Sequence, residues 1–210
     1  RLDPENKSYL ILYANVLVRL KHDELALRTL APFEKDWNRA PLPSAWLWIL
    51  SETYIRADAN ESGLEVLDLL AERHPGDHLV DLNKSQAYFK KGDYDRGLES
   101  ANTSISKESE NNPAAYFYRG KILNQLGQTE EAKEALERAD QLVPAKKLWL
   151  PMGLAHLAAG QPERATVYLR KFLELNPQSC EALEALSHAQ EASTGSSSDE
   201  GAMSGDHCQF

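Results

Sequence analysis

The sequence predicts an all-α protein built as a solenoid of stacked helix pairs. The first observation is a pattern that recurs after 33 residues, because Gly120 and Gly153 occupy equivalent places in two helical segments; self-similarity at such a period is typical of helical repeat arrays. The second is that each copy reads as two helices with apolar residues three or four positions apart. The third is that a glycine breaks each copy in the middle and a proline, Pro144 or Pro177, ends it.

The recurring residues resemble those of the tetratricopeptide repeat family. The second copy reads W-x2-M-G-x2-H, then A-x3-L and then P, beginning at Trp149 and ending at Pro177. The resemblance implies a right-handed α-solenoid of about five helix-turn-helix units. It also implies that small residues such as Gly120 let the two helices of a unit approach closely, while large residues fill the space beside them.

We expect one array over residues 1–192 and a flexible polar and acidic tail over residues 193–210. The repeats are expected near residues 6–32, 43–75, 78–112, 113–144 and 145–177, followed by a capping helix over residues 179–192. Each helix pair is too small to be stable alone, so the pairs depend on their neighbours and the last one needs a cap.

The first two repeats follow the pattern. In the first, apolar residues at helical spacing run from residue 5 to 20, a turn follows at His22, and Pro32 is expected to end or kink the second helix. The second repeat carries Tyr54 on its first helix and Gly63 on its second. These positions are expected to be structural.

The later repeats depart from the pattern in three places. In the third repeat, Asp81 and Lys84 stand where large apolar residues are usual, and no proline precedes Pro113, so its second helix is expected to run long. In the fifth repeat, Pro151 lies inside the first helix, where proline costs about 3 kcal/mol. That helix is expected to start late or to bend.

The C-terminal segment is expected to close the stack. Ser179 can cap a final helix, and Leu183 and Leu186 would cover the last repeat. From Ser193 onward the chain is rich in Ser, Gly and acidic residues, a composition that does not bury enough surface to become ordered. The tail is expected to be inert, and the alternative is a short ligand tethered to the array.

Composition and charge exclude several classes of protein. The formal net charge of -9 argues against a general nucleic-acid surface, and no apolar run approaches the roughly 20 residues of a membrane span. We therefore expect a soluble fragment with no direct membrane insertion. The opening Leu2-Asp3-Pro4 looks like the end of a preceding repeat, so we expect a longer array, with the compartment open between the cytoplasm and a bacterial periplasm. Cys180 and Cys208 are expected to be free thiols, and the alternative is a disulfide bridge between them.

No pattern in the sequence indicates catalysis. There is no G-x-S-x-G, no phosphate-binding glycine loop and no dinucleotide fingerprint. His74 and His78 flank a turn without the three or four converging ligands of a zinc site. We expect no enzyme activity, no cofactor and no metal.

The expected function is binding of another protein or peptide, as an adaptor or scaffold. In the family that the chain resembles, the first helices line a concave face, so the resemblance implies that first-helix residues left free by packing form a groove. Aromatic and Arg residues ringed by polar ones are typical of an energetic hot spot. The predicted partner-binding groove consists of Asn15, Arg19, Trp48, Glu52, Arg56, Asn83, Gln86, Phe89, Lys90, Phe117, Tyr118, Lys121 and Asn124, with Gln125, Leu150 and Leu154 beside them.

Two other functions stay open at this point. The array could be a structural spacer or assembly platform that associates through its convex surface or its edges. It could also be the substrate-recruiting arm of a larger enzyme or of an envelope-export or assembly machine. The partner and the oligomeric state are not specified by the sequence.

Overall fold

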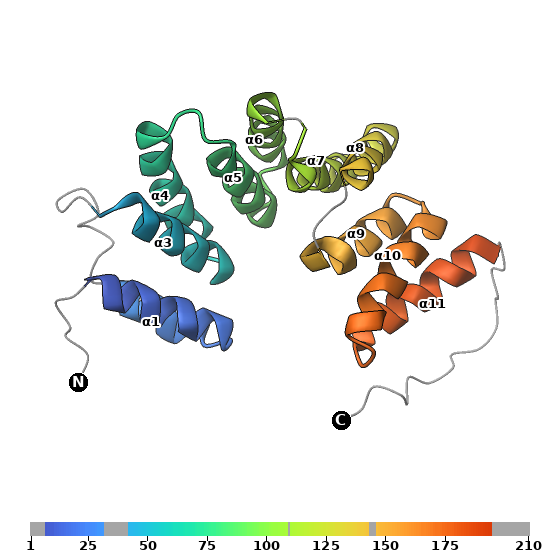
Figure 1. Ribbon diagram of the computed structural model, residues 1–210, viewed down its shortest axis with the longest axis horizontal. Coiled ribbons are helices and arrows are strands. Elements are labelled where there is room, and N and C mark those ends of the chain that lie inside the picture. Colours follow the sequence, from blue (N-terminus) through green and yellow to red (C-terminus); the bar gives the residue numbers. More distant parts are fainter. Residues whose placement is uncertain (1–6, 32–41, 109, 143–145, 195–210) are drawn as a thin grey trace. The chain divides into compact units, whose positions relative to one another are not determined.

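The computed structural model describes residues 7–31, 42–108, 110–142 and 146–194 (Figure 1). Pro32, Pro144, Cys208 and most of the expected tail lie outside these ranges. The described residues form α-helices and short 3-10 segments and no β-strand, so the all-α prediction is confirmed. The α-helices are α1 (Lys7–Arg19), α2 (Asp23–Leu30), α3 (Ser44–Arg56), α4 (Asn60–Arg73), α5 (His78–Lys91), α6 (Tyr94–Lys107), α7 (Pro113–Gln125), α8 (Thr129–Gln141), α9 (Trp149–Ala158), α10 (Pro162–Leu175) and α11 (Cys180–Thr194).

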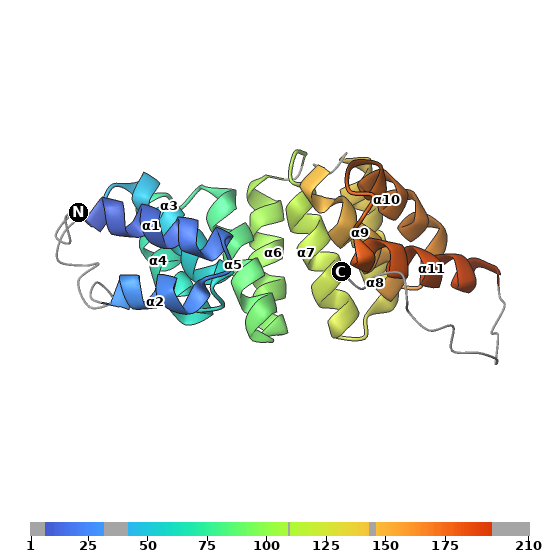
Figure 2. The ribbon, with the colours of Figure 1, turned by 90° about the horizontal axis from the view of Figure 1, so that it is seen from below.

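Consecutive helices pack against each other in pairs. α1 packs on α2, α3 on α4, α5 on α6, α7 on α8 and α9 on α10, and α11 then covers α10. The pair α5 and α6 lies side by side in both ribbon views (Figures 1 and 2). Each pair lies within one of the five expected repeat ranges, and α11 runs two residues beyond the expected cap.

The chain divides into two compact units, Arg1–Ser109 and Glu110–Phe210. The first unit contains α1 to α6, and the second contains α7 to α11. Among the described residues, no helix is long and apolar enough to cross a membrane.

The first unit is built around α1, α3 and α4. Leu47, Leu50, Tyr54 and Leu67 are fully buried there. Side chains of this size contribute about 1.5–3 kcal/mol each when buried. On α3, Leu47, Leu50 and Tyr54 are three or four positions apart, which is the spacing that predicts core positions.

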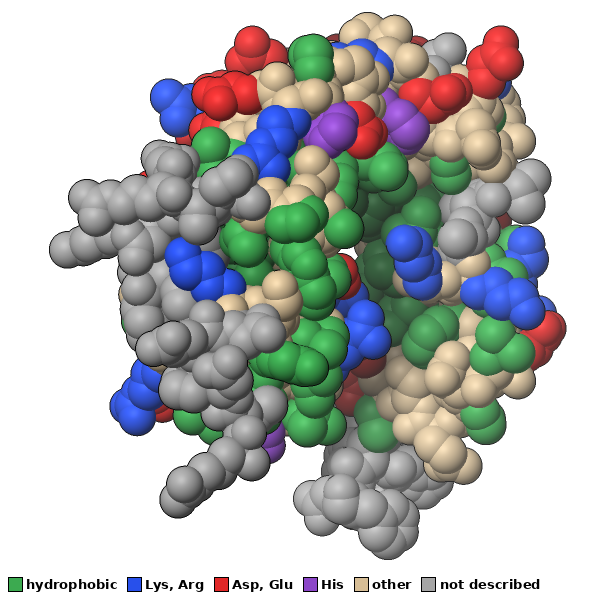
Figure 3. Space-filling model, turned by 60° about the vertical axis from the view of Figure 1, so that its left-hand side comes forward, with side chains coloured by type: hydrophobic (Ala, Val, Ile, Leu, Met, Phe, Trp, Pro, Cys, Tyr) green, Lys and Arg blue, Asp and Glu red, His purple; other side chains and the backbone are tan. Residues whose placement is uncertain are grey.

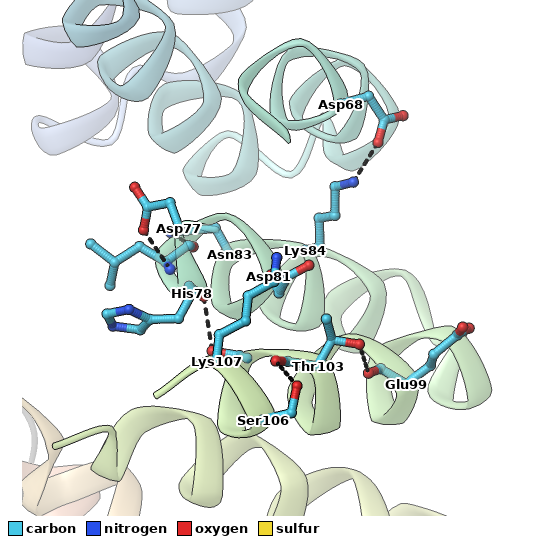
Figure 4. A network of polar contacts seen from close by, with 12 residues as sticks. Asp68, Asp77, His78, Asp81, Asn83, Lys84, Glu99, Thr103, Ser106 and Lys107 are labelled. Atoms are coloured by element: carbon cyan, nitrogen blue, oxygen red, sulfur yellow. Dashed lines mark hydrogen bonds and ion pairs between the residues drawn. The ribbon is translucent and has the colours of Figure 1, made fainter. Parts of the chain in front are cut away.

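The third repeat uses ion pairs where the second uses apolar side chains. Lys84 on α5 lies 2.6 Å from Asp68 on α4, and Lys107 on α6 lies 2.6 Å from Asp81 on α5 (Figure 4). The expectation of a long second helix is wrong, because α6 ends at Lys107 and has 14 residues, like α4. It ends where Glu108 adopts an extended conformation, without any need for a proline.

In the second unit, the paired helices leave no room for a side chain at the two repeated glycines. A Cβ atom on Gly120 would lie 2.8 Å from Cγ of Leu136, and one on Gly153 would lie 2.7 Å from Cγ of Leu169. These leucines lie on α8 and α10, the second helices of the two repeats. The prediction that small residues allow close approach within a repeat is therefore confirmed at both positions.

Pro151 has the predicted effect on α9. A 3-10 helix, Lys146–Leu148, precedes α9, and α9 begins at Trp149 and has only 10 residues, against 13 in α7. Pro151 thus lies in the first helical turn, where its missing N–H leaves no helical hydrogen bond unmade.

The last helix covers α10 with a row of small residues. Ala182, Ala185 and Ala189 are buried on α11. Cys180, at its start, is disulfide-bonded, so the expectation of a free thiol there is wrong. Composition alone did not reveal this pairing.

Candidate interaction groove

The second unit carries a hollow between its first helices and the capping helix. Its volume is about 260 Å³. We call it the α7–α9 hollow. Polar side chains of α7, apolar side chains of α9 and one carboxylate of α11 line it. The lining residues are Lys121, Asn124, Gln125, Leu150, Pro151, Leu154, Ala155, Ala158 and Glu181.

The position of each wall follows from the local sequence. Asn112 accepts a hydrogen bond from the backbone N–H of Ala115, and Pro113 occupies the first turn, so α7 starts at a defined residue. Leu150, Leu154 and Ala158 are four residues apart on α9 and therefore share one face of that helix.

Lys121 lies in a partly dehydrated position. Its Nζ atom is 5.5 Å from the ring centre of Phe117, and burial lowers the pKa of Lys121 below its ordinary value. The neighbouring Tyr118 ring contacts Phe117 edge-on at 5.2 Å, and burial raises the pKa of Tyr118 to about 12. Electrostatic interactions are stronger in such surroundings than in bulk water, so an acceptor group in the hollow would interact favourably with Lys121.

Of the predicted groove residues in the second unit, Lys121 and Asn124 line the hollow. Gln125, Leu150 and Leu154 lie there as well. Tyr118 is half-buried and packs against the core of the unit. Phe117 is a correction, because it is only 2% exposed and belongs to that core, so it presents no ring to a partner.

In the first unit, Asn15 is a second correction. Asn15 is buried, and its Nδ2 donates to Oγ1 of Thr53 at 3.0 Å, so its amide joins α1 to α3 and is not a surface group. Trp48 is half-buried against the core of this unit. Glu52 and Arg56 form an ion pair at 2.8 Å on the surface of α3.

The predicted residues of α5 are mostly engaged within the first unit. Nζ of Lys90 donates to the carbonyl oxygen of Ile55 at 2.6 Å, and Nδ2 of Asn83 donates to that of Leu79 at 2.8 Å. Phe89 is half-buried, with its ring 5.9 Å from that of Tyr94. Gln86 on α5 is half-buried, and Arg19 at the end of α1 is exposed.

The sequence did not reveal four lining residues: Pro151, Ala155, Ala158 and Glu181. For Pro151 the sequence predicts only an effect on the helix. The small side chains of Ala155 and Ala158 give no binding signal beside the larger residues around them. Glu181 lies in the segment predicted as the capping helix, residues 179–192. The signal that could have found it is the position of α11 directly after a complete repeat, where another first helix would stand.

A polar cluster around Asp140 joins α8, α9 and α10. Oδ1 of Asp140 lies 3.1 Å from Nε2 of His156 and accepts a hydrogen bond from the Tyr168 hydroxyl at 2.6 Å, while Oδ2 accepts one from Arg164 at 2.6 Å. Burial alone would raise the pKa of Asp140, but the hydrogen bonds from His156, Tyr168 and Arg164 hold it below its usual value. His156 is fully buried, and the cluster links the three helices through shared hydrogen bonds.

Within the described part of the chain, no cluster of three or more His, Cys, Asp or Glu residues could hold a metal ion.

Comparison with known proteins supports the fold. Residues 82–146 and 150–179 each match a family model described as "Tetratricopeptide repeat". No curated protein matches the chain. Among solved structures, TTC0263, a thermophilic TPR protein from Thermus thermophilus, is 19% identical with a TM-score of 0.66; the match covers 87% of this chain and 97% of that one.

Two other solved structures are similar over most of their length. MamA residues 41-end from Desulfovibrio magneticus RS-1 is 19% identical with a TM-score of 0.55, covering 85% of this chain and 99% of that one. The C-terminal part of a TPR repeat-containing protein from Cytophaga hutchinsonii is 13% identical with a TM-score of 0.53, covering 88% and 72%. The predicted all-α solenoid is thus confirmed, and such repeats generally form protein-interaction and scaffold modules. Residues 82–146 and 150–179 thus match the tetratricopeptide repeat family, and the helix pairs of the chain have the fold of solved tetratricopeptide repeat structures.

Proposed function

We propose that the second unit binds a short segment of a partner protein in the α7–α9 hollow. The observation that carries the proposal is that apolar side chains of α9 line the hollow together with amide, cationic and anionic groups. At about 260 Å³ the hollow lies just below the range of roughly 300–1,000 Å³ for small-molecule and cofactor sites, and it suits one or two side chains of a peptide.

The lining indicates which chemistry the segment should have. Leu150 and Leu154 offer contacts to an apolar side chain, because together they present a stripe of aliphatic surface. The amide groups of Asn124 and Gln125 can both donate and accept, which suits a peptide backbone. Lys121 favours an acceptor, a backbone carbonyl or a carboxylate, on the same side.

Selection from a library of random dodecapeptides displayed on phage tests this proposal with the full 210-residue chain as bait. We expect the selected peptides to share an apolar residue next to an acidic or polar one. Binding of a synthetic copy is then measured by isothermal titration calorimetry. Leu154→Asp and Lys121→Met should each weaken binding at least about tenfold, which corresponds to about 1.4 kcal/mol.

Lys171→Met is the matched control. Nζ of Lys171 lies 5.4 Å from the ring centre of Tyr168, so this lysine has the same kind of aromatic contact as Lys121 but lies on α10, outside the hollow. Its replacement should change affinity less than about twofold, well under 1 kcal/mol. Peptides that bind the Leu154→Asp and Lys121→Met chains as tightly as the original chain, with circular dichroism unchanged, would refute the assignment.

A further inference from the structure

The first helix of the chain exposes a row of large apolar side chains. Tyr9, Leu12, Tyr13 and Val16 on α1, and Leu20 directly after it, are between 39% and 61% exposed and recur at helical spacing, so they form one face. We call this row the α1 face. Figure 3 shows this end of the molecule, where hydrophobic side chains gather in a strip with Lys and Arg side chains beside it. Contiguous apolar surface of this kind marks interaction sites on soluble proteins.

The equivalent face of the second repeat is covered. Ala14 on α1 and Ser51 on α3 are the equivalent small residues, so Tyr13 corresponds to Leu50 and Val16 to Thr53. Both Leu50 and Thr53 are 0% exposed, because α1 packs on α3. In the second repeat, the face of α3 that is equivalent to the α1 face is thus covered by a neighbouring helix.

The third repeat shows what kind of helix covers this face. By the same alignment, Val16 corresponds to Ala87 on α5, which is buried in the core that α4 and α5 share. Tyr13 corresponds to Lys84, which pairs with Asp68 on α4 at 2.6 Å. Leu20 corresponds to Lys91, which pairs with Glu61 on α4 at 2.8 Å. The covering helix α4 is therefore amphipathic and acidic.

The positive charges of α1 favour a covering helix that is amphipathic and acidic, like α4. α1 has no acidic residue, Arg19 lies in its last turn, and Lys21 follows; both cations are exposed. Two α1 faces brought together would bury like charges near each other, which is unfavourable. An acidic helix would complement Arg19 and Lys21 as α4 complements Lys84 and Lys91.

We propose that the α1 face docks an amphipathic helix with acidic residues beside its apolar face. The packing continues an interface that already exists in the chain, with the incoming helix placed on α1 as α4 is placed on α5. This surface lies in the first unit and is independent of the α7–α9 hollow.

A synthetic peptide with the sequence of residues 58–73, which contains α4, is the probe. Its binding to the full 210-residue chain is measured by calorimetry and by amide chemical-shift changes. We expect saturable binding, with the shift changes concentrated on α1. Val16→Glu in the chain should weaken binding at least about tenfold, because it places a charge in the apolar contact. Arg19→Glu should weaken it about threefold, and added salt should reduce that difference.

Leu183→Glu on α11 is the matched control, because Leu183 and Val16 are both 44% exposed. It should leave binding within about twofold, since α11 lies in the other unit. A control peptide with Glu61 and Asp68 replaced by Lys should bind at least about fivefold more weakly. Circular dichroism confirms that each variant is folded.

Three results would overturn the proposal. The first is absence of saturable peptide binding at millimolar concentration. The second is binding that Val16→Glu and Arg19→Glu leave unchanged in folded protein. The third is a concentration-dependent dimer, seen by sedimentation velocity, that Val16→Glu abolishes, because a second copy of the chain would then occupy the α1 face.

Discussion

Replacing Gly153 by alanine sets two opposing effects against each other. In a helix interior alanine is favoured over glycine by about 1 kcal/mol. Here, however, the new Cβ would lie 2.7 Å from Cγ and 2.9 Å from Cδ2 of Leu169. Overpacking of this kind costs about 1–3 kcal/mol. Since Cγ is the branch point of the leucine and not its flexible end, we expect the clash to prevail and Gly153→Ala to destabilise the second unit by about 1 kcal/mol.

Urea unfolding followed by circular dichroism measures the effect, with hydrogen exchange of α9 and α10 amides to assign it to the second unit. Gly76→Ala is the control and should change stability by less than about 0.5 kcal/mol, because nothing lies within 4 Å of a Cβ at Gly76. In a Leu169→Ala background the sign should reverse, and Gly153→Ala should stabilise by up to about 1 kcal/mol. A stabilising effect with Leu169 in place would refute the reasoning.

Three further substitutions are predicted. Asp140→Asn should cost about 1–2 kcal/mol at neutral pH, because it removes the charge that accepts hydrogen bonds from Tyr168 and Arg164 in a partly buried network. Since folding lowers the pKa of Asp140, its contribution is present above the unfolded pKa and is lost as the pH falls through the folded pKa, so urea midpoints of the two proteins should converge in acid. Asn15→Ala should cost about 1–2 kcal/mol, because it removes the bond to Thr53. Lys107→Met should cost about 1–2 kcal/mol by leaving Asp81 unpaired, whereas Asp81→Leu combined with Lys107→Leu should restore stability; both are measured by urea unfolding.

The sequence predicted the helices well because the same steric constraint recurs. Gly120 and Gly153 are in contact distance of a leucine on the paired helix, and this close approach keeps the glycines at a fixed period. Helix ends were less predictable. Proline signals the end of a helix only when it is present, and α6 ends at Lys107 without one.

The groove was harder to predict than the helices. Periodicity assigns a residue to one side of a helix, but it does not tell how far the neighbouring helix overlaps that side. Phe117 and Asn15 were placed on the open side and are covered, one by the core of α8 and α9 and one by α3. Lys121 and Asn124, one turn further along α7, line the hollow. Which of two adjacent turns is open depends on tertiary packing, which the repeat pattern does not encode.

The cluster around Asp140 also has a consequence for how this sequence can diverge. His156, Tyr168 and Arg164 all share one carboxylate. A change at position 140 alone would remove the acceptor of the Tyr168 hydroxyl and would leave Arg164 with Glu137 and His156 with Gln161 as their remaining partners. Substitutions there should therefore be accompanied by changes at 156, 164 and 168 in the same lineage. An alignment of homologues should therefore show these four positions covarying as a group, while the exposed positions of α8 drift independently.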